Sequence, residues 1–397
     1  MLSYNIVLLF IFIIGLPFFL YKTVVKKRFR YRFFDRIVPK TIQEKDYILV
    51  HLASLGEAKA FLNIKTTIED LFKKKIVFSV TSNIGYDYLK KEGFDAFLAP
   101  LDFYFLYKKL FNGNLPFFAI FFETEIWPSY INYIKNNHIK IFLINARISD
   151  KSYRFYKKIK VFSDAIAKFD CIVAKSQNDK ERFDKFNKNV RVCNNIKYAI
   201  QNKKFDNDFL PLLKSYRKKI FVFSSFHSEE LDFLSKAIVS VLSFGYMIVL
   251  APRYLEDLPL FEKMLKNLGL DYNLLSSINN AIVKDCVLVN SFGVLEAIYS
   301  ISDKVFIGGS VVSTLKGHNP IEPAVYKNFV FCGLYMDSFK EEVEFLKKLG
   351  CLTQINSLDE LTSYLKQENL SFCNLDQKRL EIIECYKHIF SEFIIQA

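Results

Sequence analysis

The sequence predicts an α/β protein with two doubly wound, Rossmann-like domains and a membrane-anchoring helix at the N-terminus. Short apolar runs alternate with helical patterns along most of the chain, which is typical of parallel sheets with crossover helices. A polar connector over residues 201–219 separates two such series. With 397 residues, of which 51% are hydrophobic, the chain is long enough to bury two cores.

The N-terminal segment, residues 1–21, contains no charged side chain and is long enough as a helix to cross a hydrocarbon core. We therefore expect a membrane anchor. A basic segment follows over residues 22–46, and its cations up to residue 40 are Lys22, Lys26, Lys27, Arg28, Arg30, Arg32, Arg36 and Lys40. By the positive-inside rule the body of the protein should be cytoplasmic. Pro17 would kink the helix, so a segment lying on the bilayer surface is an alternative to a spanning one.

The first predicted domain covers residues 47–200. Its apolar runs are expected to form one sheet, with strands over residues 47–50, 76–80, 117–122, 139–144 and 171–174. Candidate site residues follow three of these strands: Ser54, Gly56 and Glu57 after the first, Glu123 and Glu125 after the third, and Arg147 after the fourth. Carboxylates and a cation at one sheet edge predict a cleft with acid–base and charge-stabilising groups. For Glu57 alone, the alternative is a favourable charge at a helix N-terminus.

The second predicted domain covers residues 220–375. Its expected strands lie over residues 220–224, 247–251, 286–289, 304–307 and 329–332. Ser225 and His227 follow the first strand, and Pro252 and Arg253 follow the next. A helix N-terminus and an arginine both suit a phosphate. A helix-capping serine and a solvated arginine are the simpler alternatives for each of them alone.

The stretch Phe306 to Pro323, FIGGSVVSTLKGHNPIEP, ends a buried strand in paired glycines and leads to a polar cluster. Glycine permits positive φ and close approach to the backbone amides, so we expect this turn to bind an anionic ligand. The candidate binding residues are Gly308, Gly309 and Ser310 in the turn and His318, Asn319, Pro320, Ile321 and Glu322 in the cluster.

The net charge and the cysteine and histidine content limit which partners, redox state and metals are expected. The formal net charge of +13 favours an anionic membrane surface or a phosphorylated lipid, and with no RNA-binding or zinc-finger motif we expect no nucleic acid. The seven cysteines show no CxxC spacing, so free thiols in a reducing compartment are expected. Five dispersed histidines give no pattern for a metal site.

The order of these motifs resembles the 3-deoxy-D-manno-octulosonic acid (Kdo) transferases of lipid A assembly in Gram-negative bacteria. HLASLGE is similar to that family's H-x-x-S-x-G-E, ETEIWP to its ETELWP, NARIS to NARLS, and SQND to A-Q-[NT]-x-x-D. NIKYAI is similar to G-N-x-K-F-D, SSFHSEE to S-T-H-x-x-E, APRY to V-P-R-H, and GGSVVSTLKGHNPIEP to GGSLVxxGGHNxLEP. The resemblance runs from the anchor nearly to the C-terminus.

The resemblance implies a GT-B glycosyltransferase whose two Rossmann-like domains face a cleft. The N-terminal domain would bind the lipid A precursor, the C-terminal domain would bind CMP-Kdo, and a helix over residues 376–397 would pack back on the N-terminal domain. Glu57 matches the general base of an inverting reaction, and Glu123 and Lys197 match residues that stabilise the transition state. Donor-binding positions would be Ser225, His227, Pro252, Arg253, Phe292, Gly293, Val294, Gly308, Gly309, Ser310 and His318 to Glu322; acceptor-side candidates are Ser54, Gly56, Glu125 and Arg147. No metal or other cofactor is expected.

Two departures and two alternatives accompany this interpretation. Gly293-Val294 stands where the family usually has Gly-Glu, so one carboxylate contact is missing unless Glu296 replaces it. Tyr198-Ala199 replaces Phe-Asp after Lys197. The alternatives are another GT-B transferase that uses a different sugar nucleotide, or a non-catalytic membrane protein that binds anionic lipid. The first would share the fold and the glycine turn, and the second would need only the anchor and the basic surface. The expected anchor places the chain at the cell inner membrane.

Overall fold

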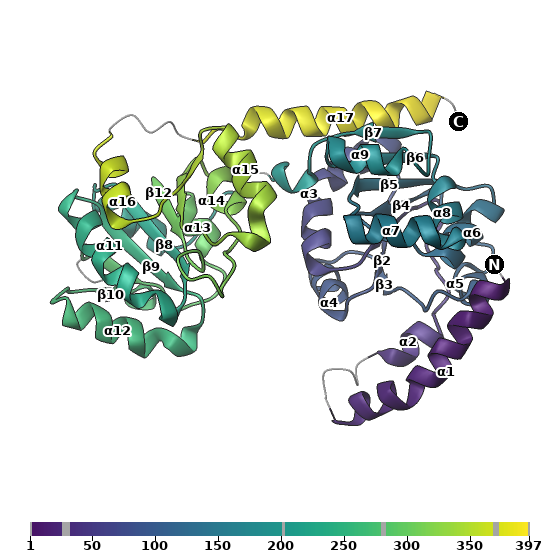
Figure 1. Ribbon diagram of the computed structural model, residues 1–397, viewed down its shortest axis with the longest axis horizontal. Helices are drawn as coiled ribbons and strands as arrows, with labels where there is room; N and C mark the ends of the chain where they lie inside the picture. The colour runs from purple at the N-terminus through teal and green to yellow at the C-terminus, as the bar shows by residue number, and fades with distance from the viewer. Residues whose placement is uncertain (1, 26–31, 201–202, 279–282, 368–372, 396–397) are drawn as a thin grey trace. The chain divides into compact units, whose positions relative to one another are not determined.

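The computed structural model describes residues 2–25, 32–200, 203–278, 283–367 and 373–395. The chain forms two compact units, Met1–Ile200 with Arg379–Ala397, and Gln201–Lys378. Each unit is built on one seven-stranded parallel sheet flanked by helices (Figure 1). The predicted α/β class with two Rossmann-like domains is therefore confirmed. Four cations of the predicted basic segment (Lys26, Lys27, Arg28 and Arg30) and the start of the predicted connector (Gln201 and Asn202) lie outside the described residues.

The sheet of the first unit has the strand order β3-β2-β1-β4-β5-β6-β7. Its strands are β1 (Ile48–Leu52), β2 (Ile76–Val80), β3 (Ala96–Leu98), β4 (Phe118–Phe122), β5 (Lys140–Ala146), β6 (Cys171–Ala174) and β7 (Val190–Val192). Strands β1, β2 and β4 are buried along their whole length, as expected for apolar runs in a sheet covered on both faces. The strand order reverses between β1 and β4. Ligands of such sheets bind beyond the carboxyl ends of the strands at this switch point.

The helices of the first unit follow its strands through short turns. They are α2 (Phe33–Ile37), α3 (Leu55–Phe72), α4 (Asn83–Lys91), α5 (Tyr104–Phe111), α6 (Pro128–Asn136), α7 (Asp150–Lys158), α8 (Lys160–Ala167), α9 (Gln177–Phe183) and the 3-10 helix η2 (Ile196–Tyr198). Serine side chains begin four of them: Ser54, Ser82, Ser149 and Ser176 each accept the backbone N–H of the residue three positions on. These caps satisfy donors that a helix start leaves unpaired and fix where each helix begins.

The C-terminal helix α17 (Asp376–Ile395) belongs to the first unit from Arg379 onward. The Phe390 ring packs against Phe72 of α3, Phe118 of β4 and Phe142 of β5. Helix α17 therefore covers part of the first sheet with the last residues of the chain.

The sheet of the second unit has the order β10-β11-β9-β8-β12-β13-β14, and its order reverses between β8 and β12. Its strands are β8 (Ile220–Phe226), β9 (Met247–Pro252), β10 (Asn273–Leu274), β11 (Cys286–Leu288), β12 (Lys304–Ile307), β13 (Phe329–Cys332) and β14 (Leu352–Gln354). Its helices are α10 (Phe209–Ser215), α11 (Leu231–Ser243), α12 (Leu258–Asn267), α13 (Leu295–Tyr299), α14 (Ile321–Val325), α15 (Lys340–Lys348) and α16 (Leu358–Leu365). Helix α10 lies inside the predicted connector and buries Leu210 and Leu213.

The N-terminal segment forms helix α1 (Leu2–Val25), which contacts the first unit near its start. Tyr4 donates a hydrogen bond to the buried Asp102 carboxylate at 2.9 Å, and the Phe12 ring packs edge-on against Phe103. Several apolar side chains of α1 are exposed, and they are Ile6, Val7, Leu9, Phe10, Ile11, Ile13 and Ile14. Among the residues that the structure describes, no helix is long and apolar enough to cross a membrane.

All seven cysteines were expected to be free thiols, but four of them form disulfides. Cys193 is bonded to Cys385 of α17, and Cys351 is bonded to Cys373. The remaining three, Cys171, Cys286 and Cys332, are free and buried. The expectation is therefore wrong for four cysteines. The first pair is 192 positions apart, so only the packing of α17 on the first unit brings these two residues together.

Candidate active site

Predicted site residues of the first unit lie where β1, β4 and β5 end. Glu57 follows β1, Glu123 follows β4, and Lys197 lies on η2, which is held against the end of β5. Because all strands are parallel, their carboxyl ends share one edge of the sheet. This edge includes the switch point between β1 and β4, where ligand sites of such sheets occur.

Glu57 lies in the first turn of α3. Its backbone N–H donates to the Ser54 hydroxyl at 3.3 Å, and its carboxylate accepts a hydrogen bond from the N–H of Ala53. This resembles a capping box, so Glu57 stabilises the start of the helix. The same two bonds hold the carboxylate beyond the end of β1.

Burial and neighbouring charges both change the pKa of the Glu57 carboxyl. Burial, with the nearby charges of Glu123 and Glu125, raises the pKa of the Glu57 carboxyl to about 8. The N–H of Ala53 and the ammonium of Lys197 act in the opposite direction. A carboxyl group with a pKa near neutrality suits proton transfer at physiological pH. Strong shifts of this kind are also typical of functional sites.

Glu123 and Lys197 form an ion pair, with 3.5 Å between Oε1 and Nζ. The Lys197 side chain is 42% exposed and that of Glu123 only 17%, so the pair lies at the border of the solvent. Glu123 has a positive φ of 55°, which is uncommon for a residue with a side chain. Its N–H donates to the carbonyl of Ile144 at 2.9 Å, so neighbouring β5 holds this conformation.

Glu125 is engaged inside the unit. Its carboxylate lies 3.3 Å from Nε2 of the buried His51 and accepts a hydrogen bond from the Trp127 indole at 2.7 Å. Burial alone would raise its pKa, but the interactions with His51 and Trp127 leave the pKa of Glu125 below its ordinary value. Glu125 therefore stays ionised beside Glu57, and its charge contributes to the raised pKa of Glu57.

The other acceptor-side candidates also lie where strands of the first sheet end: Ser54 and Gly56 after β1, and Arg147 after β5. Gly56 and Arg147 are exposed, whereas the Ser54 hydroxyl is used as the cap of α3. The backbone of Arg147 bonds to the segment that follows β4: its N–H donates to the Glu123 carbonyl at 3.4 Å, and its carbonyl accepts from the Thr124 hydroxyl at 3.1 Å. Gly56 and Arg147 are the accessible members of this set.

The glycine turn of the second unit is already occupied by a side chain of the protein. The Glu230 carboxylate accepts hydrogen bonds from the N–H groups of Gly309 at 2.7 Å, Ser310 at 3.1 Å, Val311 at 3.3 Å and His227 at 3.0 Å. Glu230 is only 1% exposed. The expectation that an external anion binds these amides is therefore wrong, because an internal carboxylate occupies them. Glu230 was not among the predicted site residues, although it falls on the glutamate of the S-T-H-x-x-E pattern that SSFHSEE resembles.

The two glycines have different physical roles from the one expected. A Cβ on Gly308 would lie 2.6 Å from the Phe226 Cα. Glycine at this position therefore allows the backbone of β8 to pack closely, and the space is not left for a ligand. Gly309 has a φ of +68°, and a Cβ there would lie 3.0 Å from the His318 ring. Ser310 is fully buried, and its hydroxyl donates to the carbonyl of Ile307 and accepts from Gly333.

Beside this turn, the structure brings together His227, His318 and Arg253. The two histidine Nε2 atoms are 2.7 Å apart and the rings are stacked, although the residues are 91 positions apart in sequence. Burial, and then the neighbouring His227 and Arg253, lower the pKa of His318 to about 4. Arg253 and Tyr254 are exposed, and the Tyr254 ring packs edge-on against His227. Imidazole and guanidinium donors of this kind suit a phosphate.

The remaining donor-side candidates shape loops of the second unit. Ser225 has a φ of 57° at an irregularity in the pairing of β8 with β9, where Phe226 is opposite Pro252. Asn319 donates to the Glu322 carboxylate at 3.2 Å and accepts the N–H of Ile321 at 3.0 Å, and Pro320 directly precedes α14.

The loop with the departure from the family pattern is well exposed. Phe292 is 74% exposed, Gly293 has a φ of 80°, and Val294 directly precedes α13. Glu296, the candidate to replace the missing carboxylate, forms an ion pair with Lys203 at 3.1 Å.

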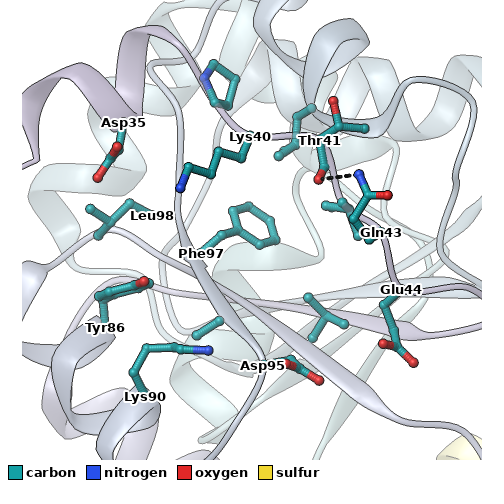
Figure 2. Close-up of a pocket in the computed structure, with 15 residues that line it drawn as sticks. Asp35, Lys40, Thr41, Gln43, Glu44, Tyr86, Lys90, Asp95, Phe97 and Leu98 are labelled. Atoms are coloured by element: carbon teal, nitrogen blue, oxygen red, sulfur yellow. Dashed lines mark hydrogen bonds between the residues drawn. The ribbon is translucent and has the colours of Figure 1, made fainter.

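A cavity of about 330 Å³ lies elsewhere in the first unit, between the segment after α2 and the edge strand β3. Figure 2 shows Lys40, Tyr86, Lys90 and Phe97 among the side chains around it. Carboxylates of Asp35, Glu44 and Asp95 also line it. It contains no predicted site residue, so it is distinct from the group around Glu57.

A model of a known protein family matches most of the first unit. Residues 26–200 match the model described as 3-deoxy-D-manno-octulosonic-acid transferase (kdotransferase). This range contains Glu57, Glu123, Glu125, Arg147 and Lys197.

Full-length relatives extend the similarity into the second unit. A 3-deoxy-D-manno-octulosonic acid transferase of Aquifex aeolicus is 29% identical over 88% of this chain and 94% of its own length. A transferase of the same name from Rickettsia bellii is 28% identical over 93% of this chain and 90% of its own. A bifunctional glycosyltransferase/methyltransferase of Fusobacterium nucleatum is 27% identical over 93% of this chain, which spans only 63% of that protein.

Solved structures show the fold. A UDP-GlcNAc 2-epimerase from Neisseria meningitidis has a TM-score of 0.56 at 11% identity, covering 88% of this chain and 100% of its own. A glycosyltransferase from Rickettsia africae has a TM-score of 0.51 at 13% identity, covering 86% of this chain and 94% of its own. Together with the two parallel sheets, these likenesses confirm the predicted GT-B fold.

Proposed function

Since the chain belongs to the Kdo transferase family, we propose that it moves Kdo from CMP-Kdo to the lipid A precursor, lipid IVA, with inversion at the anomeric carbon. The chain is a glycosyltransferase, and the donor, the acceptor and the residue roles are the proposal. One observation carries it: within the segment that matches the family, a half-buried carboxyl with a pKa of about 8 lies beside a lysine–carboxylate pair.

Glu57 acts as the general base in this proposal. Its carboxylate takes the proton of an acceptor hydroxyl while that oxygen attacks the anomeric carbon of Kdo. The new C–O bond forms as the bond from this carbon to the CMP phosphate breaks, and the electron pair leaves with CMP. The raised pKa of Glu57 supports this role, because a more basic carboxylate accepts a proton more readily.

Glu123 and Lys197 stabilise charge in the transition state. A carboxylate suits the positive charge that develops at the anomeric carbon, and an ammonium suits negative charge on the departing phosphate. Their ion pair at 3.5 Å keeps both groups near Glu57 before substrate binds. Such preorganisation avoids reorientation at the moment of reaction.

The second unit binds CMP-Kdo in this proposal. His227, His318 and Arg253 supply donors for the phosphate, and the Asn319–Glu322 pair supplies polar groups for the rest of the nucleotide. Glu230 does not contact the donor. Its part is to hold the glycine turn, against which His318 packs, in one conformation.

We further propose that the chain works at the cytoplasmic face of the cell inner membrane, where α1 anchors it and its lipid acceptor is available. The exposed apolar side chains of α1, such as Phe10 and Ile14, support this, as does the net charge of +13. No role follows for nucleic acid.

Mass spectrometry of lipid IVA incubated with the purified chain and freshly generated CMP-Kdo tests the proposal. We expect one or more Kdo mass increments on the lipid. Turnover of UDP-sugars without any use of CMP-Kdo would identify a different GT-B transferase. Binding of lipid IVA without any increment, while a control transferase is active in the same mixture, would contradict the proposed reaction.

A further inference from the structure

Lys197 lies on a short loop that α17 holds in place. Three residues separate β7 from η2, and the first of them, Cys193, is bonded to Cys385 of α17. The next residue of α17, Tyr386, reaches the same loop through Asn145. The chain end is thus connected twice, by adjacent residues, to the loop that carries Lys197.

Asn145 is the intermediate of the second connection. Its side-chain oxygen accepts the N–H of Ile196 at 3.0 Å, and its own N–H donates to the Tyr386 hydroxyl oxygen at 3.2 Å. Asn145 and Tyr386 are both fully buried. In a buried setting these N–H groups would have no water to replace a lost partner, so each bond strongly favours the observed arrangement.

The backbone at Asn145 is adapted to this role. It has a φ of 50°, and the pairing of β5 with β6 is irregular between Leu143 and Ala146. An irregularity of this kind redirects a side chain, and such features are frequent near active sites. Asn145 also lies between Ile144 and Arg147, whose backbones bond to Glu123. The same few residues of the chain therefore locate both members of the Glu123–Lys197 ion pair.

We propose that Tyr386 is a positioning residue, which acts through Asn145 and Ile196 to hold Lys197 opposite Glu123. This inference rests on the proposed function, because it assigns the C-terminal helix a part in arranging the groups that act on Kdo. The Tyr386 hydroxyl touches neither the Lys197 ammonium nor a substrate in this account. Its effect passes through two backbone N–H groups and one amide side chain.

The proposal predicts a specific electrostatic consequence. Burial raises the pKa of Glu57, the charges of Glu123 and Glu125 raise it further, and the Lys197 ammonium lowers it. If Lys197 moves away, the pKa of Glu57 rises further and activity that needs the ionised carboxylate shifts to higher pH. A change that only weakens packing of α17 would lower the amount of active protein without moving the pH profile.

Tyr386→Phe removes the hydroxyl and keeps the ring, and Tyr47→Phe is its matched control. Tyr47 is also fully buried in the first unit, but its hydroxyl donates to the Asn114 carbonyl, away from Lys197. We expect Tyr386→Phe to lower kcat roughly 10-fold, less than the roughly 100-fold that a fully misplaced group can cost. KM should stay nearly unchanged, and the rising limb of the kcat profile should move to higher pH, as in Lys197→Met. Tyr47→Phe should change neither kcat nor the position of its pH profile.

The decisive comparison is made in the Lys197→Met background. There, Tyr386→Phe should reduce kcat no further, because the group that it positions is absent. An equal fold-loss in both backgrounds would overturn the proposal. Asn145→Gly, which tolerates the positive φ but lacks the amide oxygen, should give the same pH shift as Tyr386→Phe.

Hydrogen exchange of residues 193–200 in the full chain, with its disulfides intact, provides a readout that needs no substrate. Tyr386→Phe should increase exchange in this segment, and Tyr47→Phe should leave it unchanged. Unaltered protection in Tyr386→Phe would contradict the inference whatever the transfer assay shows. Absence of Kdo transfer by the unsubstituted chain, together with increased exchange in Tyr386→Phe, would instead reject the proposed function and retain the link to Lys197.

Discussion

At the scale of single residues, Glu57 combines two roles that one substitution can separate. As a helix cap it needs only an oxygen that accepts the Ala53 N–H, which glutamine also supplies. As a base it must lose a proton. Because its pKa is about 8, we expect kcat to rise with pH up to about that value, and Glu57→Gln to lower kcat by about 10²- to 10⁴-fold with the fold intact.

The stability of the same variant provides the control. A folded-state pKa of about 8 lies above the ordinary value of 4.5, so between these two values the folded chain binds the proton more tightly than the unfolded chain. Ionisation of Glu57 therefore destabilises the fold, with an effect that grows as pH rises and is complete above pH 8. Glu57→Gln should then melt at a higher temperature than the unsubstituted chain above pH 8. Equal activity, or a lower melting temperature there, would favour the cap as the main role.

Residue pairs that are distant in sequence mark the limit of what the sequence predicts about the site. His227 and His318 were each expected to bind the donor, but their contact arises only because the turn after β12 returns to the end of β8. Glu230 lies on the glutamate of the S-T-H-x-x-E pattern, but no local pattern tells whether amides after a glycine pair face a ligand or an internal carboxylate. The polar residues at strand ends were predictable, since parallel strands bring their carboxyl ends to one edge.

At the scale of elements, the glycine turn depends on Glu230 for its shape. Four backbone N–H groups donate to this carboxylate, which is a strong arrangement because the acceptor is charged. Glu230→Gln would leave one oxygen for these donors and place an amide NH₂ against them. We expect the second unit to lose about 3 kcal/mol of stability, in the range for bonds to a charged group.

Scanning calorimetry of the full chain measures this effect. The transition of the second unit should move to lower temperature in Glu230→Gln, while that of the first unit stays in place. The neighbouring Glu229 is exposed, so Glu229→Gln is the matched control and should move neither transition. An unaltered profile in Glu230→Gln would show that the turn holds its conformation without the carboxylate.

Strand lengths explain which elements the sequence could and could not predict. All ten expected strands form, because each is a run of apolar residues buried on both sides of a sheet. The four that were missed, β3, β7, β10 and β14, have only two or three residues and are the edge strands of the two sheets. Such short segments carry too little apolar pattern to distinguish a strand from a loop.

At the scale of the whole molecule, the two predicted cores follow from composition and from the alternation of strands and helices. The disulfide bonds do not follow from either of these features. Cys193 and Cys385 lie 192 positions apart, and no spacing rule relates them. Their pairing is a consequence of how the last helix packs, which single-sequence patterns do not contain.

The net charge of +13 and the exposed apolar side chains of α1 lead to a prediction for the whole chain at a membrane. We expect it to sediment with vesicles that contain anionic phosphatidylglycerol more than with neutral phosphatidylcholine vesicles. Raising the salt from about 0.1 M to about 1 M shortens the Debye length from about 10 Å to about 3 Å, so the electrostatic part of binding should weaken.

The apolar part of this binding should remain at high salt and depend on α1. Phe10→Ser with Ile14→Ser removes two of its most exposed apolar side chains, and we expect this double variant to lose the salt-resistant fraction. Leu260→Ser with Leu349→Ser removes two exposed apolar side chains of the second unit and should bind as the unsubstituted chain does. Equal binding by both double variants would mean that the basic surface holds the chain at the membrane without insertion of α1.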